Sequence, residues 1–221
     1  MKVDFKELYK FGLPPKVGLY DPQFEKDSCG VGLVANIKGI PSREIMDDAF
    51  LVNSNMDHRG GCGFEENTGD GAGILIAIPD GFFQIAAQSL NFNLPSKGSY
   101  AVGTIFLPQS DDQRQLCKDS IESIIRDEKQ NFIGWRDVPV NPIKADVGPA
   151  SLKAQPHIEQ LFIGKEDLIN EEEFERKLFL IRKKFSHQLR GNNDLTEAGL
   201  MYACSLSAKV IVYKGMLTPS Q

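Results

Sequence analysis

The sequence predicts a single mixed domain of the α/β or α+β class. Along the 221 residues, short apolar runs of strand length alternate with amphipathic runs of helical spacing. The last two apolar runs follow each other closely enough to form an antiparallel hairpin. Alternation by itself favours a parallel, doubly wound sheet, whereas the closing hairpin and the proline-broken strands argue against a purely parallel one.

The first predicted elements are a strand and a helix. Residues 31–37 form an apolar run, closed by Gly39, that predicts a buried strand. Residues 41–56 predict a helix because Ser42 is a suitable N-cap and apolar side chains recur on one face. These apolar side chains are Ile45, Ala49, Val52 and Met56.

The remaining elements follow the same two periodicities. The predicted strands are residues 73–79, 99–108, 131–140, 156–164, 199–208 and 209–217. The predicted helices are residues 81–90, 111–130 and 171–189. The last of these helices is the clearest, since its acidic start and basic end suit the helix dipole. Its apolar face consists of Phe174, Leu178, Ile181, Phe185 and Leu189.

Composition and charge limit the classes of function. The chain has 41% hydrophobic and 25% charged residues and a net charge of -5, which is ordinary usage for a globular domain. Lysines and arginines are scattered among acidic residues, so no basic stripe is available for nucleic acid. No apolar stretch approaches the ~20 residues that span a bilayer, and residues 1–18 lack the apolar centre of a signal peptide. We therefore expect a cytoplasmic protein with a small soluble ligand.

The cysteines and histidines predict no metal site. The four cysteines are far apart without a C-x-x-C pair, and the three histidines have no metal-ligand spacing to them. A reducing cytoplasm keeps such cysteines as free thiols. The residues concerned are Cys29, Cys62, Cys117 and Cys204, with His58, His157 and His187.

Cys29 lies in the stretch KDSCGVGLVAN, residues 26–36, between polar residues and an apolar run. A free cysteine is commonly a small buried hydrophobe, and in that interpretation Cys29 opens a core strand. The alternative is a nucleophile whose proton is taken by its own α-amino group, which has an ordinary pKa of about 7.7–8.0. This chemistry needs Cys29 as the first residue, and the polar residues 25–28 are an accessible place for a proteolytic cut.

A second candidate stretch is MDHRGGCGFEENTGDGAG, residues 56–73. Its dense glycines predict a backbone that turns tightly or approaches a ligand closely. Arg59 has a planar fork suited to a carboxylate or an oxyanion, whereas we expect His58 to be a structural hydrogen-bonding group. As a phosphate loop the stretch is poor, because no Lys-Ser/Thr follows and Asp70 would repel phosphate. The alternative is a glycine-rich loop that binds no ligand.

Several stretches together resemble one family. They are GLYDPQFEKDSCGVGLVAN, MDHRGG, TGDGAGILIAIP, GWRDVPV and SLSAKVIVYKGMLTPSQ, which cover the chain from about Gly18 to its last residue. Their order and wording resemble the N-terminal glutaminase domain of the glutamate synthase large subunit, a class II glutamine amidotransferase. The resemblance implies an N-terminal-nucleophile hydrolase fold, which is a four-layer αββα sandwich of two antiparallel sheets. It therefore favours α+β over the parallel arrangement.

The resemblance also implies roles for individual residues. Residues 1–28 would be a propeptide and residues 29–221 the front part of the amidotransferase domain. Cys29 would attack the side-chain amide carbon of L-glutamine to give a thioester and ammonia, and water would then release glutamate. Arg59 and Gly60, which match the family's H-R-G motif, would line this centre.

The chain departs from the family pattern in its oxyanion hole. The family uses an Asn-Gly pair there, and the 221 residues contain no Asn-Gly dipeptide. The arginine and aspartate that hold the glutamine substrate in this family are also expected beyond residue 221. Losing one oxyanion donor costs roughly 10²–10³ in rate. We therefore expect an incomplete sandwich, as a truncated gene product, one piece of a split protein or an engineered expression product.

Two classes of function stay open. In the first, the chain is a glutamine-hydrolysing domain that becomes active only with the remaining glutamate synthase domains or subunits as partners. FMN and the iron–sulfur cluster would belong to those other domains, so no cofactor and no metal are expected in this chain. In the second, the chain is a non-catalytic remnant with a structural or interaction role. A phosphate- or nucleotide-binding α/β protein is a distant third.

Overall fold

A computed structural model describes residues 16–24 and 29–221, except for the side chains of Pro22, Arg59 and Ala198. The chain divides into two units, residues 1–31 and residues 32–221. The described part of the first unit contains the short 3₁₀ helix η1 (Pro22–Phe24) and an isolated antiparallel bridge between Val17 and Tyr20.

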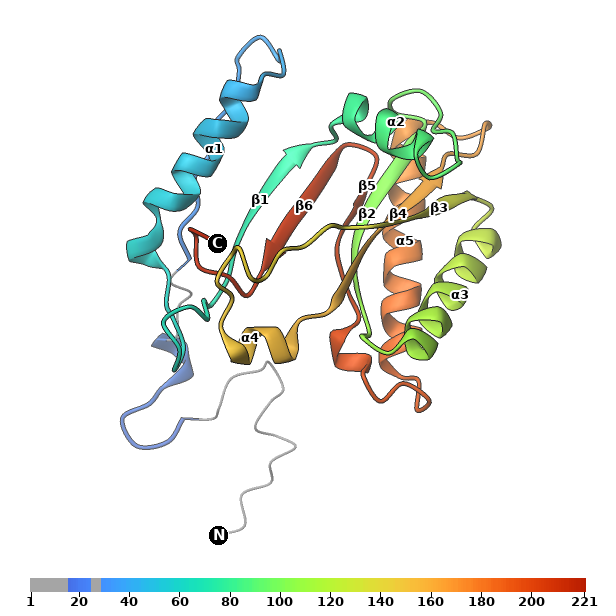
Figure 1. The fold of residues 1–221 in the computed structure, drawn as a ribbon. Coiled ribbons are helices and arrows are strands. Elements are labelled where there is room, and N and C mark those ends of the chain that lie inside the picture. Colours follow the sequence, from blue (N-terminus) through green and yellow to red (C-terminus); the bar gives the residue numbers. More distant parts are fainter. Residues whose placement is uncertain (1–15, 25–28) are drawn as a thin grey trace. The chain divides into compact units, whose positions relative to one another are not determined.

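In the second unit, the described residues form two antiparallel sheets (Figure 1). The larger sheet has the strand order β3-β4-β2-β5, and the smaller sheet pairs β1 with β6. The strands are β1 (Ala72–Ala77), β2 (Tyr100–Leu107), β3 (Asn131–Asp137), β4 (His157–Gly164), β5 (Tyr202–Ser207) and β6 (Val210–Gly215). The α+β prediction is confirmed, and the doubly wound parallel sheet that alternation favours is wrong.

Five α-helices accompany these strands in the described part of the chain, and two of them, α1 and α5, have side-chain N-caps. They are α1 (Arg43–Asn55), α2 (Asp80–Gln88), α3 (Asp111–Asp127), α4 (Pro149–Ala154) and α5 (Glu171–Arg190). The side chain of Ser42 caps α1 by accepting a hydrogen bond from the amide of Ile45, as predicted. Asn170 and Glu173 form a reciprocal capping box at the start of α5.

The main core lies between the four-stranded sheet and the helices α3 and α5, which run side by side along it (Figure 1). The five apolar side chains predicted for the inner face of α5 are all buried. From α3 the core receives Cys117, Ile121, Ile124 and Ile125. Apolar side chains at a spacing of three and four therefore fixed which helix faces cover this sheet.

A second core cluster joins the two sheets. It includes Phe83 of α2, Val102 of β2, Phe162 of β4 and Ile211 of β6. Within the described residues, no helix combines the length and the apolar character needed to cross a bilayer.

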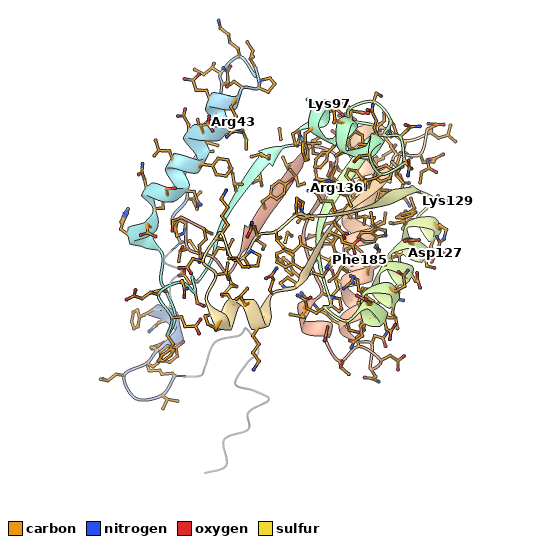
Figure 2. All side chains as sticks on the ribbon, viewed as in Figure 1. Arg43, Lys97, Asp127, Lys129, Arg136 and Phe185 are labelled. Atoms are coloured by element: carbon orange, nitrogen blue, oxygen red, sulfur yellow. The ribbon has the colours of Figure 1, made fainter. Side chains whose placement is uncertain are left out.

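A partly buried chain of polar side chains also links the two sheets. Nη1 of Arg136, labelled in Figure 2, donates to the side-chain oxygen of Gln160 at 2.8 Å. The side-chain nitrogen of Gln160 donates to the hydroxyl of Tyr213 at 2.8 Å. Burial raises the pKa of Tyr213, so this hydroxyl keeps its proton. The fully buried amide of Gln160 is thereby satisfied from both sheets.

The predicted hairpin over residues 199–217 is wrong. β5 pairs with β2, and β6 pairs with β1, so the chain changes sheets across the two residues that separate β5 from β6. Glu175 accepts hydrogen bonds from the hydroxyl of Ser207 and the amide of Ala208, and the Ser207 hydroxyl accepts from the amides of Lys209 and Val210. Because side chains satisfy these backbone amides, the turn between β5 and β6 needs no backbone hydrogen bonds between the two strands.

The strand predicted over residues 31–37 is also wrong. These residues have no strand pairing, and the side chains of Val31, Leu33 and Ile37 are 89%, 89% and 104% exposed. A β-branched, apolar run has strand propensity, but a strand forms only where a neighbouring strand satisfies its backbone groups. No strand among the described residues supplies that ladder to this run.

Candidate functional site

Cys29 is a free and exposed thiol in the first unit. Its exposure contradicts the interpretation of Cys29 as a buried residue that opens a core strand. Residues 1–15 and 25–28, which include the predicted cut, lie outside the described residues. The thiol is accessible to reagents, and its role as the nucleophile stays a prediction.

Arg59 and Gly60 lie where α1 gives way to the glycine-rich stretch. Arg59 ends the 3₁₀ helix η2 (Asp57–Arg59), and the amide of Gly60 donates to the carbonyl of Asp57 at 3.0 Å. His58 Nδ1 lies 3.0 Å from the carbonyl oxygen of Asn55. A carbonyl only accepts, so Nδ1 carries the hydrogen, and His58 has the structural role expected of it. Cys29 belongs to the other unit, so its grouping with Arg59 and Gly60 stays a prediction.

After Gly60 the glycine-rich stretch folds back on itself before it enters β1. The amide of Asp70 donates to the carbonyl of Gly61, and the amide of Gly63 donates to that of Thr68, both at 2.9 Å. An isolated bridge between Cys62 and Gly69 completes this small hairpin. The Asp70 carboxylate lies beside Gly61, where a Cβ would be 3.2 Å from one of its oxygens.

The glycines of this stretch allow close contacts with the chain itself. A Cβ on Gly69 would lie 2.2 Å from the carbonyl oxygen of Leu217, and one on Gly73 would lie 2.7 Å from that of Tyr213. Gly148 also approaches this loop closely, because a Cβ on Gly148 would lie 2.2 Å from the hydroxyl of Thr68. The sequence indicated close approach of the backbone, and the partner in these three places is the chain's own backbone or side chain.

Glu65 fastens this loop to α4. Its carboxylate accepts hydrogen bonds from the Thr68 hydroxyl at 2.6 Å and from the amide of Ala150 at 3.0 Å. The Thr68 hydrogen bond is the main reason that the pKa of Glu65 lies below its ordinary value. Glu65 is therefore a structural carboxylate at the N-terminal turn of α4, and the sequence alone did not reveal that role.

A cavity of about 690 Å³ lies next to the loop, at Thr68, in the second unit. Its walls are mainly apolar, and Lys144 and Lys214 are among the lining residues. The apolar walls include Phe106, Val140, Val147, Ile158, Met216 and Leu217. The volume falls in the range of small-molecule sites. No pattern in the sequence predicts this cavity, because its walls come from segments more than a hundred residues apart.

The other three cysteines differ sharply in their surroundings. Burial raises the pKa of the Cys117 thiol to about 11, and burial also raises the pKa of Cys204 to about 11, against a smaller opposing effect of Lys214. Cys62 is exposed like Cys29. Cys29 and Cys62 are therefore exposed, whereas buried Cys117 and half-buried Cys204 are held in the unreactive protonated form near neutral pH.

Comparison with known proteins gives one consistent result. A family model described as Glutamine amidotransferases class-II matches residues 29–221. The chain is 43% identical over 210 residues to the glutamate synthase (NADPH) large chain of Bacillus subtilis, covering 95% of this chain and 13% of that protein.

Two eukaryotic relatives agree with this result. The ferredoxin-dependent glutamate synthase 1 of Arabidopsis thaliana is 41% identical, with 92% of this chain and 12% of that protein covered. The glutamate synthase (NADH) of Saccharomyces cerevisiae is 38% identical, with 95% and 10% covered. The chain thus spans only 10–13% of the length of these three relatives.

Proposed function

Because this chain belongs to the class II glutamine amidotransferases, we propose that it serves as the glutaminase part of a glutamate synthase, releasing ammonia from L-glutamine. The family identified from the sequence motifs is thereby confirmed. The observation that carries the proposal is the family match, which begins at Cys29, the residue on which the chemistry depends.

In the proposed first step, the Cys29 sulfur attacks the side-chain amide carbon of glutamine. The thiol proton passes to the α-amino group of Cys29, which becomes free once residues 1–28 have been removed as a propeptide. The same proton then goes to the departing nitrogen, the carbon–nitrogen bond breaks, and ammonia leaves. The product on the enzyme is a γ-glutamyl thioester.

In the proposed second step, water attacks the thioester. The carbon–sulfur bond breaks, glutamate leaves, and the sulfur regains its proton. Arg59 supports the surroundings of the nucleophile, and Gly60 offers backbone to the centre. The hydrogen bond between the Gly60 amide and Asp57 fixes the backbone at this position, which supports a role that depends on backbone placement.

The proposed domain is the front part of a four-layer αββα sandwich. The two antiparallel sheets and the pair of helices on the larger sheet support this architecture. We propose that the other groups of the active site, the oxyanion hole and the substrate clamp, come from outside residues 1–221. The partners are then L-glutamine and the remaining glutamate synthase domains, in the cytoplasm, without nucleic acid or membrane.

FMN and the iron–sulfur cluster are proposed to belong to those other domains. An iron–sulfur cluster needs several thiolates brought together. Cys117 is buried in the core between α3 and the large sheet, where its raised pKa opposes the thiolate form. The cysteines of this chain therefore do not suit a cluster.

The test is glutamate release from glutamine by the protein purified from its native host. We expect Cys29→Ser to lower the rate by more than about 10³-fold, because the nucleophile is lost. Cys62→Ser is the matched control, since Cys62 is also exposed and should leave the rate within a factor of two or so. Equal rates for the native protein and Cys29→Ser would favour the alternative, a non-catalytic structural or interaction module.

A further inference from the structure

Three ligand-type side chains that have no assigned part in glutamine hydrolysis meet at one end of the large sheet. They are Asp137 at the end of β3, and His157 and Glu159 at the start of β4. One oxygen or nitrogen atom from each lies within 4.8 Å of the others. From this arrangement we propose that Asp137, His157 and Glu159 bind a divalent cation of the zinc and cobalt type.

The antiparallel pairing of β3 with β4 brings these three side chains together. Asp137 is directly opposite Glu159 in the antiparallel pairing of β3 with β4. His157 lies two residues before Glu159, so both side chains leave the same face of β4. The three groups are therefore held on one face by backbone pairing and do not depend on a loop. The sequence showed only a lone histidine here, because Asp137 lies twenty residues before His157 and only strand pairing brings it near.

The distances suit a shared cation. His157 Nε2 lies 3.2 Å from Oδ1 of Asp137 and 3.4 Å from Oε1 of Glu159. Neighbouring ligands around a tetrahedral zinc ion, with bonds of about 2.0–2.2 Å, are about 3.3–3.5 Å apart. The third distance is the one between the carboxylate oxygens of Asp137 and Glu159. The Asp137 side chain is 79% exposed, so it is free to adjust this distance.

More carboxylate oxygens face His157 Nε2 than Nε2 has hydrogens to donate to them. Nε2 carries at most one hydrogen, yet it faces oxygens of two carboxylates. Two carboxylates directly opposite each other on neighbouring strands also repel. A cation that accepts one lone pair from each of the three groups would satisfy Nε2 and both oxygens and would remove the repulsion.

Two basic side chains from α3 reach Glu159. Lys118 Nζ donates to Oε2 of Glu159 at 2.7 Å, and Nε of Arg114 lies 3.8 Å from Oε1. Asp111 also pairs with Arg114. These three carboxylates and two cations leave one net negative charge around His157. Lys118 occupies the oxygen that does not face His157, which is how an outer group orients a carboxylate ligand.

The chain contains its own reporter for this site. Trp135 is the only tryptophan of the sequence, and it shares a strand face with Asp137. Lys118 Nζ lies 5.0 Å from the centre of the Trp135 ring and also contacts Glu159. A paramagnetic Co²⁺ ion bound at the cluster should therefore quench Trp135 fluorescence at short range.

The experiment is a Co²⁺ titration of the 221-residue chain near neutral pH, with Cys29→Ser and Cys62→Ser present to remove the exposed thiols. We expect saturable quenching that Zn²⁺ reverses by competition. His157→Gln and Asp137→Asn should each raise the apparent dissociation constant by more than about 10-fold. His187→Gln is the matched control, because His187 is an exposed histidine on α5, and it should leave the titration unchanged.

Two results would overturn the proposal: no saturable quenching up to about 1 mM Co²⁺, or equal quenching in the parent chain and His157→Gln. Circular dichroism shows whether each variant is folded. If His157→Gln fails to fold, Asp137→Asn decides, because this exposed substitution preserves the shape of the side chain. Unchanged binding in a folded Asp137→Asn would then reject the three-ligand site.

Discussion

The carbonyl oxygen of Leu217 occupies the space where a side chain on Gly69 would begin, since an added Cβ would lie 2.2 Å from it. This contact fixes the segment after β6 against the glycine-rich loop. We predict that Gly69→Ala lowers the free energy of unfolding by about 1–3 kcal/mol, because backbone must move to admit the methyl group. Urea denaturation followed by circular dichroism measures this loss.

The matched control for that prediction is Gly81→Ala in α2. A Cβ on Gly81 would meet nothing within 4 Å. Alanine in a helix is favoured over glycine by about 0.5–1 kcal/mol, so this variant should gain stability. If both substitutions changed stability by the same amount, the contact between Gly69 and Leu217 would not be a constraint on the fold.

Thiol reactivity should separate the four cysteines into two pairs. A general thiol reagent should modify exposed Cys29 and Cys62 and leave buried Cys117 and half-buried Cys204 unmodified. The pKa values of about 11 for Cys117 and Cys204 mean that their thiolate fraction rises only as the pH approaches 11. Peptide mapping by mass spectrometry after a timed reaction reports each site. Rapid modification of Cys117 at neutral pH would contradict the packing of α3.

A glutamine-like electrophile should be more selective still. In the mature, complete protein, diazo-oxo-norleucine should label Cys29 and spare Cys62, Cys117 and Cys204, because only Cys29 is proposed to combine a nucleophilic role with a glutamine site. Cys62 is the informative comparison, since it is equally accessible to the reagent. Equal labelling of Cys29 and Cys62 would count against a formed glutamine site.

The mature protein should begin at Cys29. The reason is chemical, because the proposed base is the α-amino group of the same residue, which must be free of any preceding peptide bond. Intact-mass measurement on protein from the native host should show the loss of residues 1–28. A preparation that hydrolyses glutamine with its full N-terminus intact would rule out this form of activation.

The Glu128 carboxylate should make stability depend on pH. Hydrogen bonds from Lys177, at 2.8 Å, and from Lys184 lower its pKa below the ordinary value. A lowered folded-state pKa stabilises the protein above the unfolded value, near pH 4.5, and this stabilisation is lost as the pH falls through the folded value. Glu128→Gln should therefore cost about 1–3 kcal/mol at neutral pH and progressively less below pH 4.5.

A matched substitution of an exposed glutamate on α5 controls for charge alone. Glu172 is 83% exposed and forms only a 3.8 Å pair with Arg176, so Glu172→Gln should change stability by less than about 0.5 kcal/mol at any pH. Equal pH profiles for the two variants would show that the Glu128 pairs contribute nothing beyond general charge.

Residues 1–221 on their own should hydrolyse glutamine negligibly even when Cys29 is exposed. The proposed oxyanion hole comes from outside these residues, so the charge of the tetrahedral intermediate would be left to solvent, and loss of one donor alone costs roughly 10²–10³ in rate. The assay compares glutamate release by this chain, by its Cys29→Ser variant and by a version extended through the next part of the reading frame. If the short chain matched the extended one and Cys29→Ser abolished its activity, the missing groups would lie within residues 30–221.

The elements that the sequence predicted well are those with a long, one-sided pattern. Helix α5 has five apolar residues at regular spacing, and all five are buried. The strand predicted over residues 31–37 had only a short apolar run in its favour, and such a run does not reveal whether a neighbouring strand exists. The glycine-rich stretch was predicted in part. Its glycines indicated that the backbone approaches another group closely, but the sequence did not show that Leu217 is the partner of Gly69.

The sequence by itself determined the helices other than α4, most of the strands, the apolar faces and the motifs around Cys29 and Arg59, since these depend on neighbours within a few positions. The tertiary structure decided that β5 and β6 belong to different sheets and that Asp137 faces Glu159 across a strand pair. It also decided that the walls of the cavity at Thr68 come together. The physical reason is that local periodicity specifies which face of a segment is apolar, whereas strand partners depend on contacts between distant residues, for which a single sequence carries no spacing signal.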